Sequence, residues 1–155
     1  MKRIIGLSLL ILLFSFVPTQ AQQVNLPNDC LKILNKKFRG WKLVKMQMEE
    51  GVLGHNLIKG DWNGDKKTDY AILIERSNPN DVWVIAFIKK QSGYSFHKID
   101  GGDSIFLMKK GAKDYNYETQ KNFTYKNDAI FVGTGCCGSS YIWRKGKFIG
   151  FVTSD

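Results

Sequence analysis

Histidine and cysteine are scarce in this sequence, with two and three residues among 155. The histidines, His55 and His97, lie far from each other, and the sequence holds no C-x-x-C pair. A structural zinc site needs cysteines and histidines at short, regular spacings. The sequence therefore disfavours a zinc-stabilised module.

A recognisable catalytic set is also missing. The sequence around each histidine is typical of a partly exposed residue and not of a catalytic one. His97 could form a catalytic dyad with Cys136 or Cys137, but in a secreted protein those thiols are expected to be oxidised. The glycine-rich run at 133–140 lacks the lysine of a phosphate-binding loop. We therefore predict that the protein is not an enzyme.

The long apolar run is confined to the N-terminus. Met1-Lys2-Arg3 precedes an apolar stretch from Ile4 to Val17, and small residues follow up to Ala21. This pattern predicts a secretory signal peptide over 1–21 and a periplasmic or extracellular protein, with no stable membrane span after cleavage. A retained membrane anchor is the alternative.

The remaining residues, 22–155, have the length of one domain, 134 residues. Loss of Lys2 and Arg3 lowers the formal charge from +9 to +7. The lysines are scattered and the arginines few, whereas nucleic-acid binding requires a clustered basic face. We expect a generally solvated basic surface and no nucleic-acid partner.

Secretion makes a disulfide the expected state of two of the three cysteines. A bridge from Cys30 to Cys136 or Cys137 would close a loop of about 106 residues, worth roughly 4–5 kcal/mol by chain entropy. A Cys136–Cys137 bridge is the minority alternative.

The periodicity predicts an α+β fold, with one N-terminal helix packed on a meandering antiparallel sheet. The helix should begin with Asn28 as N-cap and end near Gly40. The continuous apolar run at 82–88 is typical of a strand buried on both faces. A hairpin is expected around 126–128 and another around 145–146, whereas 109–121 should form a long mobile loop.

The most informative segment is Gly60–Asp69, whose oxygen-bearing side chains alternate at Asp61, Asn63 and Asp65 and return at Asp69. Ca²⁺ needs six to eight oxygen ligands, and a tight loop with such spacing can fold them around one point.

The run GDWNGDKKTDYAILI resembles the calcium loop of FG-GAP (integrin-type β-propeller) repeats over about 15 residues. The resemblance implies metal ligation by Asp61, Asn63, Asp65 and Asp69, with Lys67 giving its backbone carbonyl. Lys66 stands where the family has a glycine. The loop occurs once, so the resemblance concerns the loop and not a whole propeller. The overall layout also resembles uncharacterised small secreted bacterial proteins.

A metal-free interpretation competes with this one, because Asp and Asn also form Asx-turns with their own backbone. Trp62 lies within the polar loop, where it could stack on a glycan or fold back onto the protein. We expect a secreted, non-enzymatic module that binds Ca²⁺ and an unknown protein or envelope glycan. The alternative is a periplasmic enzyme inhibitor or immunity-type protein.

Overall fold

The computed structural model describes residues 24–45, 54–76, 81–135 and 137–154. The predicted signal peptide lies outside these ranges. The described elements are one helix and eleven strands: α1 (Asn28–Lys37), β1 (Lys42–Leu43), β2 (Leu57–Gly60), β3 (Asp69–Glu75), β4 (Val82–Lys89), β5 (Tyr94–Asp100), β6 (Ser104–Met108), β7 (Lys113–Asn116), β8 (Lys121–Thr124), β9 (Ala129–Thr134), β10 (Cys137–Arg144) and β11 (Lys147–Ser154).

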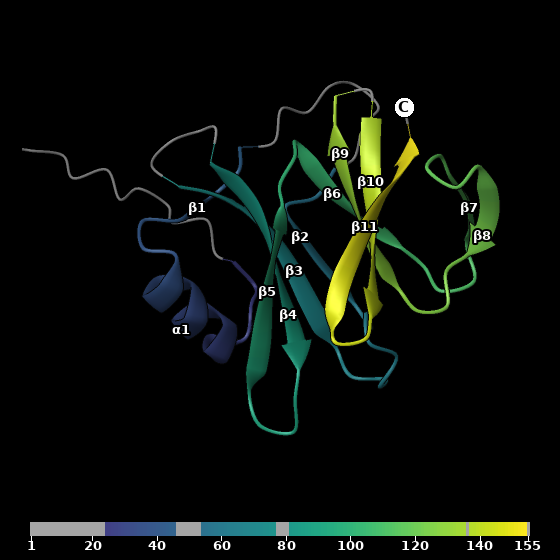
Figure 1. Ribbon diagram of the computed structural model, residues 1–155. Helices are drawn as coiled ribbons and strands as arrows, with labels where there is room; N and C mark the ends of the chain where they lie inside the picture. The colour runs from purple at the N-terminus through teal and green to yellow at the C-terminus, as the bar shows by residue number, and fades with distance from the viewer. Residues whose placement is uncertain (1–23, 46–53, 77–80, 136, 155) are drawn as a thin grey trace, which may run out of the picture.

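The strands form three antiparallel sheets (Figure 1). The first has the order β1-β3-β4-β5, with β2 also paired to β3. The second has the order β11-β10-β9-β6, and the third is the β7–β8 hairpin. Among the described residues the only helix has ten residues, and no helix is long and apolar enough to cross a membrane.

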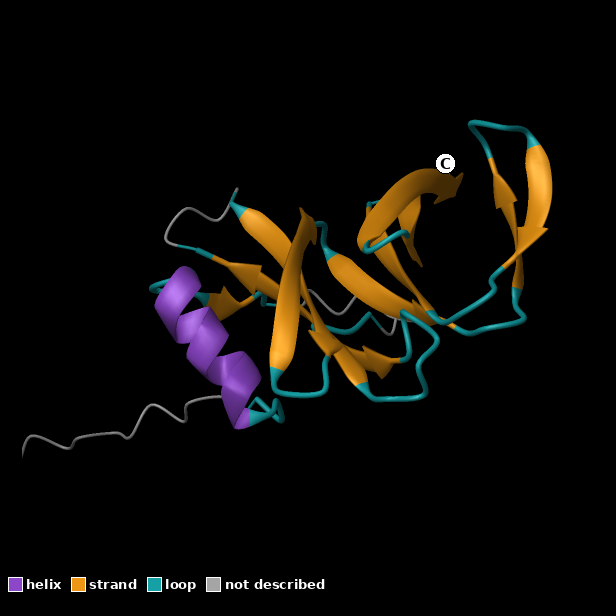
Figure 2. Cartoon of the chain, turned by 60° about the horizontal axis from the view of Figure 1, so that its bottom comes forward, coloured by secondary structure: helices purple, strands orange, loops and turns teal. Residues whose placement is uncertain are grey.

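The first sheet lies between the helix and the second sheet (Figure 2). Alternate residues of β3 point to opposite faces, so Ile72 and Ile74 pack with the helix residues Cys30 and Leu34. Their neighbours Ala71 and Leu73 pack toward the second sheet. This arrangement explains why β3 and β4 have continuous apolar runs, because both of their faces are buried.

The structure is β-rich rather than clearly α+β, since one short helix accompanies three sheets. The strands pair antiparallel as predicted, but they form three sheets instead of the single meandering sheet that the sequence predicted. The predicted N-cap was wrong by one residue: the helix already begins at Asn28, Pro27 occupies the N-cap position, and no side chain makes a capping hydrogen bond. It ends at Lys37, three residues before Gly40.

The prediction of a long loop over 109–121 was wrong, and so was the hairpin around 126–128. Strand β7 forms inside that segment and pairs with β8, whereas β9 pairs with β6 and β10. Tyr125 holds the β7–β8 hairpin in place: its hydroxyl lies 2.5 Å from Asp114 Oδ2 and 2.6 Å from Ser140 Oγ. This buried polar contact joins residues distant in sequence, so local patterns carry no sign of it.

The predicted disulfide between Cys30 and Cys137 is not present, because Cys30 carries a free, fully buried thiol. Cys30 belongs to α1 and faces the first sheet, whereas Cys137 begins β10 in the second sheet. Because Cys30 is free, neither predicted bridge to it forms. Cys136 lies outside the described residues, so the alternative bridge between Cys136 and Cys137 stays a prediction. The 133–140 run is not a loop throughout: it contains the end of β9 and the start of β10.

Candidate functional site

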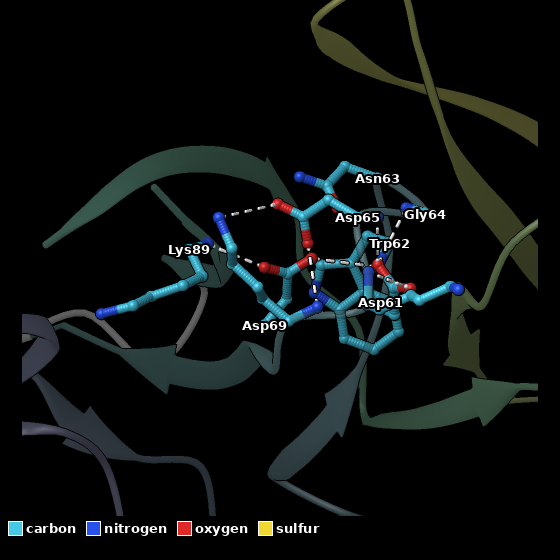
Figure 3. A network of polar contacts seen from close by, with 9 residues as sticks. Asp61, Trp62, Asn63, Gly64, Asp65, Asp69 and Lys89 are labelled. Atoms are coloured by element: carbon cyan, nitrogen blue, oxygen red, sulfur yellow. Dashed lines mark hydrogen bonds and ion pairs between the residues drawn. The ribbon is translucent and has the colours of Figure 1, made fainter. Parts of the chain in front are cut away.

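The acidic loop connects β2 to β3, and the strand pairing brings its two ends together. Gly60 is the last residue of β2 and pairs with Asp69, the first residue of β3. The eight residues between them, 61–68, fold into a tight loop whose polar side chains point back onto its own backbone (Figure 3).

The carboxylate of Asp61 is the centre of the loop. Its Oδ1 accepts hydrogen bonds from the backbone N–H groups of Gly64 at 2.8 Å and Asp65 at 3.0 Å. Its Oδ2 accepts one from the N–H of Lys66 at 2.9 Å. One side chain thus satisfies three donors that a loop would otherwise leave to water.

Two Asx-turns complete the loop (Figure 3). Asn63 Oδ1 accepts from the N–H of Asp65 at 3.1 Å, and Asp65 Oδ1 accepts from the N–H of Lys67 at 2.9 Å. The ammonium group of Lys67 lies 3.8 Å from Asp65 Oδ2. The hydrogen bond from the Lys67 N–H lowers the pKa of Asp65 below its usual value.

Asp69 differs from the other carboxylates because it is fully buried. Its two oxygens accept hydrogen bonds from the N–H groups of Trp62 at 3.0 Å and Lys89 at 2.7 Å. Burial raises the pKa of Asp69 to about 6, and the nearby charges of Asp65 and Asp61 add to this rise. The negative charges of Asp61 and Asp65 therefore repel that of Asp69.

The backbone of the loop passes twice through the left-handed region. Gly64 has φ +77°, and Lys66 has φ +65° at the position where the FG-GAP loop has glycine. A lysine in this conformation costs roughly 1 kcal/mol relative to glycine. The loop thus adopts the left-handed conformation at position 66 without a glycine.

Trp62 folds back into the protein and is fully buried in the core between the two large sheets. A Cβ on Gly60 would lie 2.3 Å from this indole ring, so the glycine makes room for it. Trp62 is therefore not an exposed platform for a glycan. Its indole N–H has no hydrogen-bond partner among the described residues.

Sequence reasoning missed two residues that hold the loop against the second sheet. Asp128 Oδ2 accepts a hydrogen bond from the N–H of Asp61 at 3.1 Å, and its Oδ1 accepts one from Lys110 N–H at 3.0 Å. Asn127 donates to the carbonyl oxygen of Trp62 at 3.3 Å. The Asn127-Asp128 pair carries a turn signal, but nothing in the sequence assigns it to a loop 60 residues away.

The four predicted side-chain ligands thus share one loop, but their oxygens bond to backbone N–H groups. Among the described residues, no group of three or more histidine, cysteine, aspartate or glutamate side chains has the arrangement of a ready metal site. Each carboxylate oxygen that accepts one N–H retains a second lone pair. Ligation of Ca²⁺ would therefore require the Asp61, Asn63 and Asp65 side chains to turn toward a common point.

The other candidate residues are not brought together. His55 pairs with Ile105 through the backbone and packs against Phe106. His97 packs its ring against Trp143, 4.7 Å between centroids, near the C-terminal end of β10. Cys137 is at the opposite end of that strand, so the thiol–imidazole dyad does not form with it.

Comparison with known proteins found no relative of this chain. A scan against protein-family models found no match, and searches of curated proteins and of solved structures found none either.

Proposed function

We propose that this protein is a secreted, non-enzymatic binding module whose Asp61–Asp69 loop takes up Ca²⁺ as a structural ion. The observation that supports this best is that Asp61, Asp65 and buried Asp69 share one loop, where burial raises the pKa of Asp69 and the charges of Asp65 and Asp61 add to the rise. Carboxylates that hold a proton more tightly because of one another also gain from a shared cation. The left-handed backbone at Lys66 keeps the turn of a calcium-type loop.

The residues proposed to bind the ion are Asp61, Asn63, Asp65, Asp69 and the carbonyl group of Lys67. Ca²⁺ would supply positive charge at the loop and fix its shape against Asn127 and Asp128. The partner is an envelope or extracellular component, in line with the predicted signal peptide. The inhibitor-type alternative has no specific contact to support it.

Isothermal titration calorimetry tests the ion-binding part. We expect saturable Ca²⁺ binding with a dissociation constant on the order of 100 µM, since neighbouring lysines oppose the ion, and much weaker Mg²⁺ binding. Asp65→Asn should weaken Ca²⁺ binding, and Glu118→Gln, which removes the same charge from an exposed site, should not. Absence of a Ca²⁺ signal would favour a metal-free set of Asx-turns.

A further inference from the structure

Three turns meet at one end of the molecule, which we call the loop end: the acidic loop, the β4–β5 turn and the β10–β11 turn (Figure 1). Asp69 joins the first two through its hydrogen bond from the N–H of Lys89. Lys90 joins the second to the third, because its ammonium group lies 5.9 Å from the centroid of the Trp143 ring.

The charge of the protein is unevenly distributed between the two ends of the first sheet. The loop end carries the carboxylates Asp61, Asp65 and Asp69, and two more lie beside it: Asp128 bonds to the acidic loop and Asp29 is close to the β4–β5 turn. The three turns carry seven basic side chains: Lys66, Lys67, Lys89, Lys90, Arg144, Lys145 and Lys147. At the opposite end the described carboxylates outnumber the basic side chains: Glu75, Asp81, Asp100 and Asp103 against Lys42, Arg76 and Lys98. The fold thus gathers lysines that are scattered in the sequence.

Aromatic rings lie among these basic groups. Trp143 and Phe148 flank the β10–β11 turn, are half-buried, and pack edge to face at 5.1 Å between centroids. His97 supports both rings from β5. Trp143 also packs on the core between the two large sheets, and Lys90 contacts its ring. A half-buried tryptophan beside lysines matches the boundary between lipid headgroups and water, where the exposed part of the ring meets the headgroups and the ammonium groups contact phosphates.

We infer that the loop end binds an anionic phospholipid surface. This inference rests on the proposed function, because it gives the envelope partner a chemical class. The three turns lie at the same end of the molecule (Figure 1), so a negative surface at that end would face their exposed lysines. Ca²⁺ in the acidic loop would add positive charge on the same side.

Vesicle co-sedimentation tests the inference with phosphatidylglycerol vesicles, using phosphatidylcholine vesicles for comparison. A basic residue near an anionic membrane contributes about a five-fold factor in binding. The variant Lys90→Gln/Lys145→Gln/Lys147→Gln should therefore bind about 100-fold more weakly. Lys36→Gln/Lys113→Gln/Lys121→Gln, which removes the same charge from the helix and the β7–β8 hairpin, should retain most of the binding.

The remaining outcomes separate this inference from the calcium proposal. Binding that is lost in the first variant but persists in EDTA supports the surface even if calorimetry shows no Ca²⁺ uptake. Equal losses in both variants, provided that their melting temperatures match, would overturn the inference, because only net charge would then matter. Binding to soluble polyphosphate but not to phosphatidylglycerol vesicles would overturn it too.

Discussion

The Asp69 carboxylate is buried, is held by two backbone N–H groups, and forms no ion pair with any residue that the structure describes. Its pKa in the folded protein, about 6, lies above the ordinary value of 3.8. A raised folded-state pKa contributes stability that is present at low pH and lost as the pH rises through the folded value. Asp69 should therefore lower the free energy of unfolding between about pH 4 and pH 6.

This effect can be measured by chemical denaturation of the wild type and Asp69→Asn at pH 4.5, 5.5 and 7. Without Ca²⁺, the free energy of unfolding should fall by about 1–3 kcal/mol more in the wild type than in the variant as the pH rises across this range. Asparagine does not titrate, and its amide can accept only one of the two hydrogen bonds, so the comparison uses pH dependence and not absolute stability. Parallel pH profiles for the two proteins would contradict the burial argument.

The backbone conformation of Lys66 also affects the stability of the protein. With φ at +65°, Lys66→Gly should raise the free energy of unfolding by up to about 1 kcal/mol. Lys67→Gly is the matched control, because Lys67 is not among the residues with positive φ. That control should destabilise the protein by about 0.5–1 kcal/mol through greater freedom of the unfolded chain. Thermal and urea unfolding of the two variants distinguish them.

Among the elements, the connection between β8 and β9 holds the acidic loop. Asp128→Ala would leave the N–H groups of Asp61 and Lys110 without their acceptor and should cost about 1–3 kcal/mol. Hydrogen exchange at these two amides should accelerate, while amides of β4 should change little. Glu118→Ala removes an exposed carboxylate as a control. Unchanged hydrogen exchange at the Asp61 amide would show that Asp128 does not hold the acidic loop in place.

The packing of the helix on the first sheet should protect the Cys30 thiol from alkylation. Burial raises the pKa of its thiol to about 12, so the nucleophilic thiolate is both rare and covered. Alkylation followed by mass spectrometry should leave Cys30 unmodified in the native protein and modify it after unfolding. A disulfide at Cys30 in a non-reducing peptide map, or rapid native labelling, would contradict the structure.

Local elements were predictable where the hydrophobic pattern was strong. The apolar run of β4 and the turn at Lys145-Gly146 were identified, and the β2–β3 connection was recognised as one tight loop. The β7–β8 hairpin was missed because Tyr125 docks it through a buried polar contact with Ser140. The division into separate sheets also depends on long-range pairing, which a single sequence does not reveal.

The shape of the acidic loop was predictable to the same degree, whereas metal ligation by its residues stays a prediction. Alternating oxygen-bearing side chains indicated that Asp61, Asn63 and Asp65 act together, and all three fold onto one loop. Asp128 could not be found, since it bonds to the loop across 67 residues of sequence. The burial of Trp62 against Gly60 likewise follows from packing between sheets and not from the polarity of its neighbours.

At the scale of the whole molecule, the central claim is that Ca²⁺ stabilises the fold through the acidic loop. The most direct test is thermal unfolding with EDTA, 10 mM Mg²⁺ or 10 mM Ca²⁺. For a dissociation constant of about 100 µM, Ca²⁺ adds roughly 2.7 kcal/mol, or about 5–10 °C for a domain of this size. Ca²⁺ should produce that shift in the wild type, Mg²⁺ should produce a much smaller one, and Asp65→Ala should show no shift with Ca²⁺. A melting temperature independent of Ca²⁺, or an equal shift in Asp65→Ala, would contradict the central claim.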